Sequence, residues 1–443
     1  MSHYKPYSAY KDSGVQWLGR VPEHWQVKRL KFIATVQTGI AKGKDNVGKD
    51  TIEVPYLRVA NVQDGYLSLD DVTTIEIPRE DLPRYSLRPG DVLMNEGGDF
   101  DKLGRGHVWQ GEIAPCIHQN HVFAVRPAKV PSYWLNAFSG SQPAQFYFMG
   151  RSKQSTNLAS ISSSNVMELP VVVPPDDELP AVLAHLDRET ARIDALIEKK
   201  TRFIELLREK RQALITHAVT KGLDPNVKMK DSGVEWLGEV PEHWEALPLR
   251  RVVSAVKTGG TPSEELPAPD ADGLAWYTPG DFGSSLVLTS SEKRVSALAV
   301  STGEAKVYPA GSVLVVSIGA TLGKVGYIVD PASANQQINA VIPSSRVNGY
   351  FLAYSLSVKT EAMWFLANAA TIGIMNQEKT KEIWLAVPSP SEQKAITEYL
   401  DKDTGRLDSL IGKTELSIGL LKERRSALIT AAVTGQIDLR EAV

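Results

Sequence analysis

Two stretches of the chain have the residue types of catalytic motifs, but neither can form the site that its motif describes. Residues 43–50, GKDNVGKD, have the glycine and lysine spacing of a phosphate-binding loop, but Asp50 stands where a serine or threonine must reach magnesium. A Pro-Asp pair at 175–176 and Glu-Lys-Lys at 198–200 follow the residue order of a nuclease. The second group falls within a predicted long helix, which would hold its carboxylate far from the first. We therefore expect neither a nucleotide site nor a nuclease site.

Other catalytic signatures are missing from the sequence. The 8 histidines and the single cysteine, Cys116, form no CxxC or HExxH array. There is no glycine-rich loop for S-adenosylmethionine and no Asn-Pro-Pro-aromatic motif for base flipping. Cys116 is expected to be a small core residue, and His24 and His243 are expected to fix a turn against the tryptophan that follows each. We expect no metal, no cofactor and no catalytic residue, so the function must lie in binding.

Residues suited to DNA gather in glycine-rich loops. Glycine lets backbone amides approach phosphates, while Asn, Gln, Lys and Arg can hydrogen-bond to base edges. In the first half of the chain the candidates are Lys42, Lys44, Asn95, Gly98, Lys102, Arg105, His107, Gln119 and Asn120. In the second half they are Thr258, Thr261, Ser317, Thr321, Lys324, Asn335 and Gln336. One such loop alone would be an ordinary surface turn, but their recurrence at matching places with different letters predicts two heads that read different sequences.

A repeat positions these loops. KDSGVQWLGRVPEHW at 11–25 returns as KDSGVEWLGEVPEHW at 230–244, with 13 of 15 residues identical at an offset of 219. LLREKRQALITHAVTKGLD at 206–224 returns as LLKERRSALITAAVTGQID at 420–438, with 12 of 19 identical at an offset of 214. We call 11–25 and 230–244 the PEHW segments. A duplicated frame around divergent inserts predicts a pseudo-two-fold internal repeat.

The inserts have the pattern of α/β domains. Short apolar runs after turn signals predict strands at 53–60, 91–94 and 121–126, followed by helical structure from Pro131. The second insert repeats this order, with strands at 275–277, 312–318 and 338–342 and a helix over 349–366. We therefore predict an α/β (α+β) fold. Its four segments are two α/β domains at 1–170 and 230–385 and two helical regions at 171–229 and 386–443.

Two long helices follow the inserts. Leu186, Ile193, Leu207 and Leu214 recur every seven residues, as do Leu400, Leu407, Leu421 and Leu428, and each series is interrupted once by a polar residue. Leu196 and Phe203 in the first helix, and Leu410 and Ile411 in the second, are expected at the intermediate positions of the seam. Each helix could instead lie on its own domain. Because the stripes match, we predict an antiparallel coiled coil.

The overall composition narrows the possible classes of protein. The net charge is -3, so no overall positive field announces a nucleic acid, although local clusters can still bind one. No stretch approaches the ~18 apolar residues of a membrane span, and the N-terminus has no apolar signal-peptide core. One cysteine fits a reducing compartment. We expect a soluble cytoplasmic protein without a membrane partner.

Taken together, these segments resemble the specificity subunits of type I restriction-modification systems, HsdS. The resemblance rests on the PEHW segments, GGTP and SIGATLGKVG with NQQINAVIP in the second insert, GGDFDKLGRG in the first, and the two LLxExRxALIT helices. It implies that the inserts are target recognition domains, each for one half of a bipartite double-stranded DNA target. It further implies that the helices dock two modification (methyltransferase) subunits, that restriction subunits join the complex, and that the chain is not itself an enzyme.

The resemblance also sets expectations for ligands and partner contacts. S-adenosylmethionine, ATP and magnesium would be bound by the partner subunits. The helices would set the spacer between half-targets, and an insertion near Glu198 would lengthen it. Residues expected to contact partners are Arg208, Arg211, Leu214, Arg425 and Leu428. A coiled-coil adaptor that never binds DNA, and a DNA-modifying enzyme with an unrecognised site, stay open as alternatives.

Overall fold

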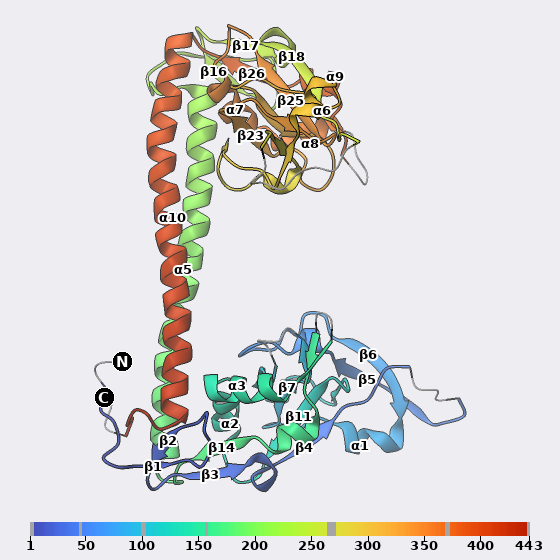
Figure 1. Cartoon of the computed structure of the whole chain (residues 1–443), viewed down its shortest axis with the longest axis vertical. Coiled ribbons are helices and arrows are strands. Elements are labelled where there is room, and N and C mark those ends of the chain that lie inside the picture. The colour runs from blue at the N-terminus through green and yellow to red at the C-terminus, as the bar shows by residue number, and fades with distance from the viewer. Residues whose placement is uncertain are drawn as a thin grey trace. The chain divides into compact units, whose positions relative to one another are not determined.

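The chain folds into two compact units that share two long helices. The computed structural model describes residues 4–43, 47–98, 103–155, 158–263, 272–367 and 373–440 (Figure 1). One unit comprises Met1–Thr201 with Leu416–Val443, and the other comprises Arg202–Glu415. Each long helix therefore gives one half to each unit. The four segments predicted from the sequence are distributed over these two units, because both helical regions are divided between them.

The first unit begins with a small two-stranded sheet and a buried tryptophan, residues 10–25, which we call the mount. In the first PEHW segment β1 (Tyr10–Asp12) pairs antiparallel with β2 (Arg20–Pro22), and the fully buried Trp25 follows. β3 (Gln26–Arg29) then pairs antiparallel with β14 (Pro170–Val173). We call this two-stranded pair the neck, because the chain leaves the mount through β3 and returns through β14. Everything between, residues 30–169, is the first head.

The first head is a mixed α/β domain. Its sheets have the strand orders β4-β11-β7-β9, β10-β5-β6 and β12-β13-β8. Its elements are η1 (Leu30–Phe32), β4 (Ala34–Thr38), β5 (Thr51–Leu57), η2 (Val59–Asn61), β6 (Thr73–Pro78), η3 (Arg79–Asp81), α1 (Leu82–Tyr85), β7 (Val92–Asn95), β8 (Gly97–Gly98), β9 (Gly106–Val108), β10 (Ile117–His118), β11 (Val122–Pro127), α2 (Ser132–Ser139), α3 (Gln142–Arg151), β12 (Lys153–Ser155), β13 (Leu158–Ser160) and α4 (Ser163–Met167). The strands and the helical region predicted for the first insert are confirmed.

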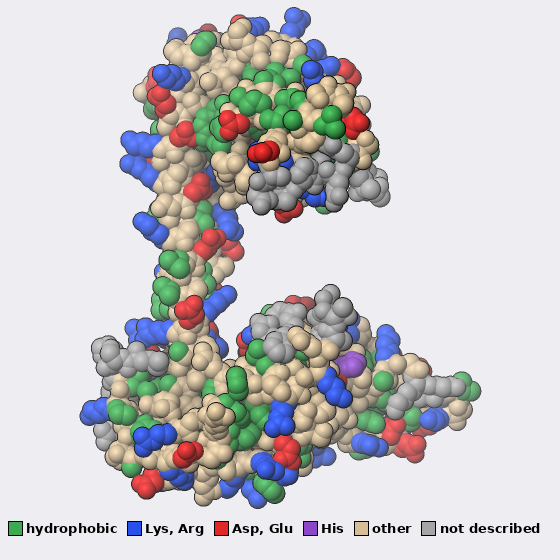
Figure 2. All heavy atoms as spheres, viewed as in Figure 1, with side chains coloured by type: hydrophobic (Ala, Val, Ile, Leu, Met, Phe, Trp, Pro, Cys, Tyr) green, Lys and Arg blue, Asp and Glu red, His purple; other side chains and the backbone are tan. Residues whose placement is uncertain are grey.

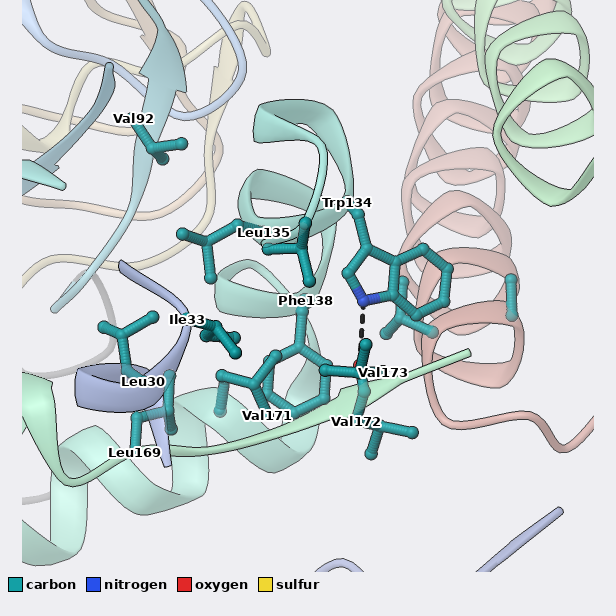
Figure 3. Packing of buried hydrophobic residues seen from close by; sticks show 14 of the residues in the cluster. Leu30, Ile33, Val92, Trp134, Leu135, Phe138, Leu169, Val171, Val172 and Val173 are labelled. Carbon is teal, nitrogen blue, oxygen red and sulfur yellow. Dashed lines mark hydrogen bonds between the residues drawn. The ribbon is translucent and has the colours of Figure 1, made fainter. Parts of the chain in front are cut away.

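One apolar core joins the head to its neck. Trp134 and Phe138 of α2 are fully buried and pack over the β14 valines, beside Leu30 and Ile33 (Figure 3). The Trp134 indole Nε1 donates to Val172 O at 2.8 Å, so this bulky ring is buried without losing its hydrogen bond. The same core continues into the near ends of both long helices. The head is therefore held by packing at its base.

The second unit repeats this design. Its mount is β15 (Met229–Asp231) paired with β16 (Glu239–Pro241), and its neck is β17 (Glu245–Pro248) paired with β26 (Trp384–Val387). Residues 249–383, the second head, contain η5 (Leu249–Arg251), β18 (Val253–Thr258), β19 (Leu274–Tyr277), η6 (Pro279–Asp281), β20 (Val287–Leu288), β21 (Lys293–Val295), α6 (Ala297–Ser301), β22 (Val313–Val316), β23 (Val325–Ile328), β24 (Ser333–Ala334), β25 (Ile338–Pro343), α7 (Gly349–Ser357), α8 (Thr360–Ala367) and α9 (Gln377–Lys381). Its sheets run β18-β25-β22-β23-β20 and β21-β19-β24. The order β18-β25-β22-β23 corresponds to β4-β11-β7-β9 and the order β24-β19-β21 to β10-β5-β6, which confirms the predicted internal repeat.

The long helices are α5 (Leu179–Lys221) and α10 (Pro390–Val433) (Figure 1). The predicted capping box of α10 is present, since Glu392 N donates to Ser389 Oγ at 3.4 Å and Ser389 N donates to Glu392 Oε2 at 3.2 Å. Within the second unit Arg208 pairs with Glu415 and Arg211 with Asp408, so rising numbers on α5 meet falling numbers on α10. The predicted antiparallel pairing is confirmed.

The intermediate seam positions were predicted one residue too early. Leu196 and Phe203 of α5 are 40% and 44% exposed, and Leu410 of α10 is 44% exposed. On α5 the half-buried Ile197 and the buried Ile204 take these positions instead, whereas on α10 the predicted Ile411 is half-buried. An a/d seam alternates spacings of three and four, and we chose the three where the helix uses the four. The error matters because it moves three large apolar side chains from the seam to the surface.

Among the described residues, none of the helices is both long enough and apolar enough to cross a bilayer.

Candidate nucleic-acid interface

The first head brings three of the predicted loops together at one end of its sheet. Asn120 N donates to Ile40 O at 3.2 Å, which joins the turn after β10 to the loop that carries Lys42. Glu96 N donates to His121 O at 2.9 Å, which joins the same turn to the glycine-rich loop after β7. Segments some 80 residues apart in sequence thus adjoin in space, and the exposed Lys42 lies at their margin. Lys44 and Lys102 fall outside the described residues.

The polar residues of the glycine-rich loop are held by the loop that precedes β6. Asn95 donates from Nδ2 to Val62 O at 2.8 Å. The Arg105 guanidinium lies 3.5 Å from an Asp64 carboxylate oxygen, with the arginine side chain 30% exposed. Both side chains are therefore oriented by their own head, and Arg105 keeps part of its fork open to solvent.

The glycines of this loop do different work. A Cβ on Gly106 would lie 1.6 Å from Leu93 O, and one on Gly104, at φ +71°, would lie 2.2 Å from the Phe148 ring. These two positions need glycine for packing against the protein. Gly98 has no atom within 4 Å of a notional Cβ, so its backbone can approach a ligand.

Three further candidates of the first head are half-buried. His107 keeps Nδ1 buried with no hydrogen-bond partner in the described part of the chain, and burial lowers the pKa of this histidine despite the opposing charge of Glu112. Gln119 Oε1 accepts from Val59 N at 3.4 Å. The Asn120 amide lies 3.3 Å from the His121 ring. These three side chains pack largely within the turn and expose little surface to a ligand.

The second head builds its surface around Thr258. Thr258 donates from Oγ1 to Asn339 Oδ1 at 2.8 Å, and the Gln377 amide lies 3.1 Å from the same hydroxyl. Lys306 donates from Nζ to Thr258 O at 2.8 Å. Thr258 was predicted from the sequence, whereas Asn339, Gln377 and Lys306 were not. Asn339 carried a usable signal, since it is a polar residue inside the apolar strand β25.

The amide-rich turn before β25 closes on this cluster. Thr261 donates from Oγ1 to the exposed Gln336 at 2.6 Å, so the GGTP loop and the NQQ turn are in contact. Asn335 is 8% exposed and donates to Gln337 Oε1 at 3.1 Å. The available surface of this turn is therefore carried by Gln336.

The SIGATLGK loop offers few free side chains. Ser317 is 1% exposed and donates to Gln337 O at 2.9 Å. Lys324 is exposed as a residue, but its ammonium donates to Phe282 O at 3.0 Å. Thr321 is half-buried. Ser317 lies within the fold, whereas Thr321 and Lys324 keep some accessible surface.

In both heads a glycine packs directly against the backbone of a neighbouring loop. We call this close approach the backbone crossing, and it positions the loops described above. A Cβ on Gly39 would lie 2.0 Å from His118 O, and one on Gly259 would lie 2.0 Å from Asn335 O. Each glycine follows a threonine at the end of the first sheet strand, Thr38 and Thr258. The two heads therefore share the crossing and differ in the side chains around it.

The residues expected to contact partners lie on the coiled coil. Arg208 and Arg211 make ion pairs of 3.0 and 2.9 Å to α10, and Arg425 pairs with Asp194 at 2.9 Å. Such exposed pairs contribute about 0.5 kcal/mol each. Leu428 is buried in the first unit's core and Leu214 is half-buried beside the second. All five of these residues therefore make contacts within the chain itself.

Exposed apolar residues repeat along the same helices. Leu196 and Leu410 are related by the offset of 214, as are Leu206 (47% exposed) and Leu420 (56% exposed). Figure 2 shows Lys and Arg side chains standing out along the α5 and α10 pair, with hydrophobic side chains between them. Leu196 and Leu420 belong to the first unit, and Leu206 and Leu410 to the second. Each unit thus presents an equivalent apolar pair.

The geometry argues against the catalytic motifs considered above. At 1.5 Å per residue, Glu198 lies about 28 Å along α5 from its first residue, so its carboxylate is far from Asp176. Residues 43–50 lead into the strand β5, whereas a phosphate-binding loop leads into a helix. In the described ranges, no group of three or more His, Cys, Asp or Glu could hold a metal ion. Burial raises the pKa of the Cys116 thiol to about 12, as suits a core residue.

Comparison with known proteins points to one family. Residues 241–415 match the family model described as the type I restriction modification DNA specificity domain. A putative type I restriction enzyme MjaX specificity subunit from Methanocaldococcus jannaschii is 22% identical, with 96% of each chain covered. The type I restriction enzyme EcoBI specificity subunit from Escherichia coli is 19% identical, covering 96% of this chain and 89% of its own.

Solved structures share the fold over nearly the whole chain. A chain from a structure on complex assembly and conformational transition of the type I R-M system has a TM-score of 0.72 at 17% identity, covering 94% of this chain and 99% of its own. The HsdS subunit from Thermoanaerobacter tengcongensis has a TM-score of 0.51 at 16% identity, covering 94% and 98%. Two heads on paired helices are therefore a fold that solved proteins already contain.

Proposed function

We propose that the chain is a specificity subunit of a type I restriction-modification system and recognises a DNA sequence on behalf of a modification enzyme, because residues 241–415 match the DNA specificity domain and the whole chain is similar to such subunits. The observation that carries this proposal is the contrast between the heads. The strand orders β4-β11-β7-β9 and β10-β5-β6 recur in the second head as β18-β25-β22-β23 and β24-β19-β21, yet the glycine-rich loops differ, with GGDFDKLGRG in one head and SIGATLGKVG in the other. A repeated scaffold with unlike edges suits a bipartite target whose halves differ.

Each head would read its half-target through base edges in the major groove. Arginine and amide side chains make the bidentate contacts that distinguish base pairs there. Arg105 and Gln336 are the side chains that combine accessible surface with this chemistry. Backbone at Gly98 would contribute phosphate contacts that position the head without reading sequence.

The coiled coil would fix the unread spacer between the half-targets. α5 has 43 residues and α10 has 44, and both are continuous from one unit into the other. A paired helix resists bending more than a loop of the same length, so it favours one spacing over a range of spacings. A single spacer length is therefore expected in the target.

The chain would recruit its catalytic partners as two equivalent modification subunits. Support comes from the repeated apolar pairs, Leu196 with Leu420 and Leu206 with Leu410, since an exposed patch that occurs twice suits one partner bound twice. Restriction subunits would join through the assembled complex. S-adenosylmethionine, ATP and magnesium would be held by these partners, and this chain would act in the cytoplasm without a catalytic site of its own.

Charge placed on the repeated apolar pairs should remove partners one at a time. Leu206→Glu and Leu420→Glu are each expected to lower the bound modification subunits from two to one, and the double variant to none, as counted by native mass spectrometry. Both leucines are exposed, so the melting temperature should change little. Leu298→Glu, at a 65% exposed leucine on α6, is the matched control. Full occupancy in the double variant would contradict this assignment of the docking surface.

Methylation mapping tests the proposed function directly. A host that carries this chain with its modification subunit should show one bipartite motif with two unlike halves and a fixed spacer. No methylation, together with no salt-dependent DNA binding by the complex, would favour the coiled-coil adaptor instead. Methylation by the purified chain alone would favour an unrecognised enzyme.

A further inference from the structure

The glycine-rich loop of the first head is the inner edge of a three-stranded sheet. After α3 the chain forms the hairpin β12–β13, and β13 pairs antiparallel with β8, setting Ala159 opposite Gly98 and Ser160 opposite Gly97. Ile161 N donates to Glu96 O at 2.9 Å and continues the pairing. β12 is thereby the outer strand of this sheet, separated by β13 from the loop that is expected to approach DNA.

The same augmentation occurs in the second head, so it belongs to the scaffold. Ile318 bridges antiparallel to Ile374, and Gly319 N donates to Gly373 O at 3.3 Å. Met375 N donates to Ser317 O at 2.8 Å, as Ile161 does to Glu96 in the first head. In both heads, therefore, the segment that follows the third α-helix, α3 in the first head and α8 in the second, lines the glycine-rich loop.

The two lining segments differ in charge. Residues 140–167 of the first head contain Arg151 and Lys153 and not one Asp or Glu. The second head has ANAATIGIMNQ at 367–377, which has no charged residue. Arg151 and Lys153 are both exposed, and neither forms an ion pair with another residue that the structure describes.

Arg151 is connected to the mount through two aromatic rings. Its guanidinium lies 5.8 Å from the centre of the Tyr147 ring, a cation–π distance. Tyr147 in turn packs against Trp17 of the first PEHW segment, with ring centres 5.7 Å apart. Lys153 lies two residues further on, at the start of β12. Arg151 thus contacts a tyrosine that packs on the mount, and Lys153 stands on the edge strand β12 of the sheet that contains the glycine-rich loop.

We propose that Arg151 and Lys153 form a binding site for the phosphate backbone of duplex DNA in the first head only. The proposal rests on the proposed function of the chain. Exposed cations that lack acidic neighbours in their segment suit a polyanion, and Gly98, two strands away in the same sheet, is open to a ligand. Phosphate contacts position a protein on DNA and carry no sequence information, so this site would add affinity to one half-target without changing its bases.

The test is the salt dependence of DNA binding by the assembled complex. Each phosphate contact contributes a slope of about 0.9 to log K against log salt. The double variant Arg151→Ala/Lys153→Ala should lower the slope by about 2, weaken binding to target and random duplexes equally, and leave the methylated motif unchanged. Lys153→Glu alone should weaken binding more than Lys153→Ala.

Lys129→Ala is the matched control, because this exposed lysine follows the far end of β11 from the glycine-rich loop. It should leave the slope unaltered. An unchanged slope in the double variant would overturn the proposal. So would self-association of Lys153→Ala with a normal slope, which would make Lys153 a guard of the edge strand. Loss of a protein partner at a normal slope would point to an acidic protein surface instead. If the unaltered complex shows no salt-dependent DNA binding, the proposed function fails first.

Discussion

A chain in which residues 30–169 are replaced by a second copy of residues 249–383 is expected to direct methylation to a target with two identical half-sites. The half-target of the first head should disappear completely, and that of the second head should occur twice in inverted orientation, with the spacer conserved. Methylation mapping in a host that supplies the modification subunit measures all three features at once.

The physical reason is that the two necks are interchangeable. Leu30 N donates to Leu169 O at 2.9 Å, and Leu249 N donates to Ile383 O at 2.7 Å, so each head starts and ends at one hydrogen-bonded point. The strands on the mount side pair in the same antiparallel manner, over four residue pairs in each unit. A head can therefore be exchanged without altering any backbone pairing of the mount.

The junctions are the control for this experiment. An exchange over residues 30–165 instead cuts through α4 (Ser163–Met167) and separates its cap, Ser162 Oγ to Asn165 N at 3.2 Å, from the end of the helix. This second chimera should be less stable than the first. A chimera joined at 30 and 169 that folds, assembles and still methylates the original two halves would contradict the reading of the heads as separate recognition modules.

The repeat could be read from the sequence because the mounts and helices are under the same packing demands in both units. Trp25 and Trp244 are both almost fully buried, and both donate their indole hydrogen to a glutamate near the start of a long helix. Inside the heads the letters diverge, because only backbone pairing is shared there. The offset moves from 219 at the PEHW segments to 220 at Gly39 and Gly259, and a register irregularity in β18 between Val253 and Ala255 accounts for the extra residue.

The candidate site could be predicted as loops but not as individual contacts. Ser317 and Asn335 have the chemistry to read bases, yet the fold buries both beneath their own turns. Tertiary pairing determines this, and no local pattern in the sequence reveals it. The hairpin β12–β13 was missed for a related reason: its partner β8 is a strand of two glycines, which has no strand propensity. Basic residues in an acid-free segment were the available signal.

Replacing Glu178 by alanine is expected to destabilise the first unit by about 3 kcal/mol, measured by chemical denaturation. Glu178 is 6% exposed and accepts hydrogen bonds from Trp25 Nε1 at 2.9 Å and Tyr7 OH at 3.2 Å. It also pairs with His24 at 2.6 Å and with Arg440 of the C-terminal segment at 3.2 Å. Alanine would leave the buried Trp25 and Tyr7 donors without an acceptor, and a buried donor without an acceptor costs more than the hydrogen bond contributes.

Glu392 is the matched control, since it occupies the equivalent place in the second unit. It pairs with His243 at 2.8 Å and accepts from Trp244 Nε1 at 3.2 Å, but its side chain is 37% exposed and water can replace it. Burial opposes its ionisation, and the bonds from His243, Ser389 and Trp244 outweigh burial and lower its pKa. Its charged form thus stabilises the fold above the ordinary carboxyl range, and this contribution is lost as the pH falls through the lowered pKa.

Glu392→Ala should therefore cost about 1 kcal/mol, from the lost cap and the partly exposed ion pair. Because the two glutamates belong to different units, the two variants should shift different parts of the unfolding curve if the units melt separately. Glu178→Gln keeps an acceptor but removes the charge, so it should fall between Glu178→Ala and the unaltered chain. Equal losses for Glu178→Ala and Glu392→Ala would mean that burial does not distinguish the two sites, and that the closure of the first unit by the C-terminal segment adds nothing to its stability.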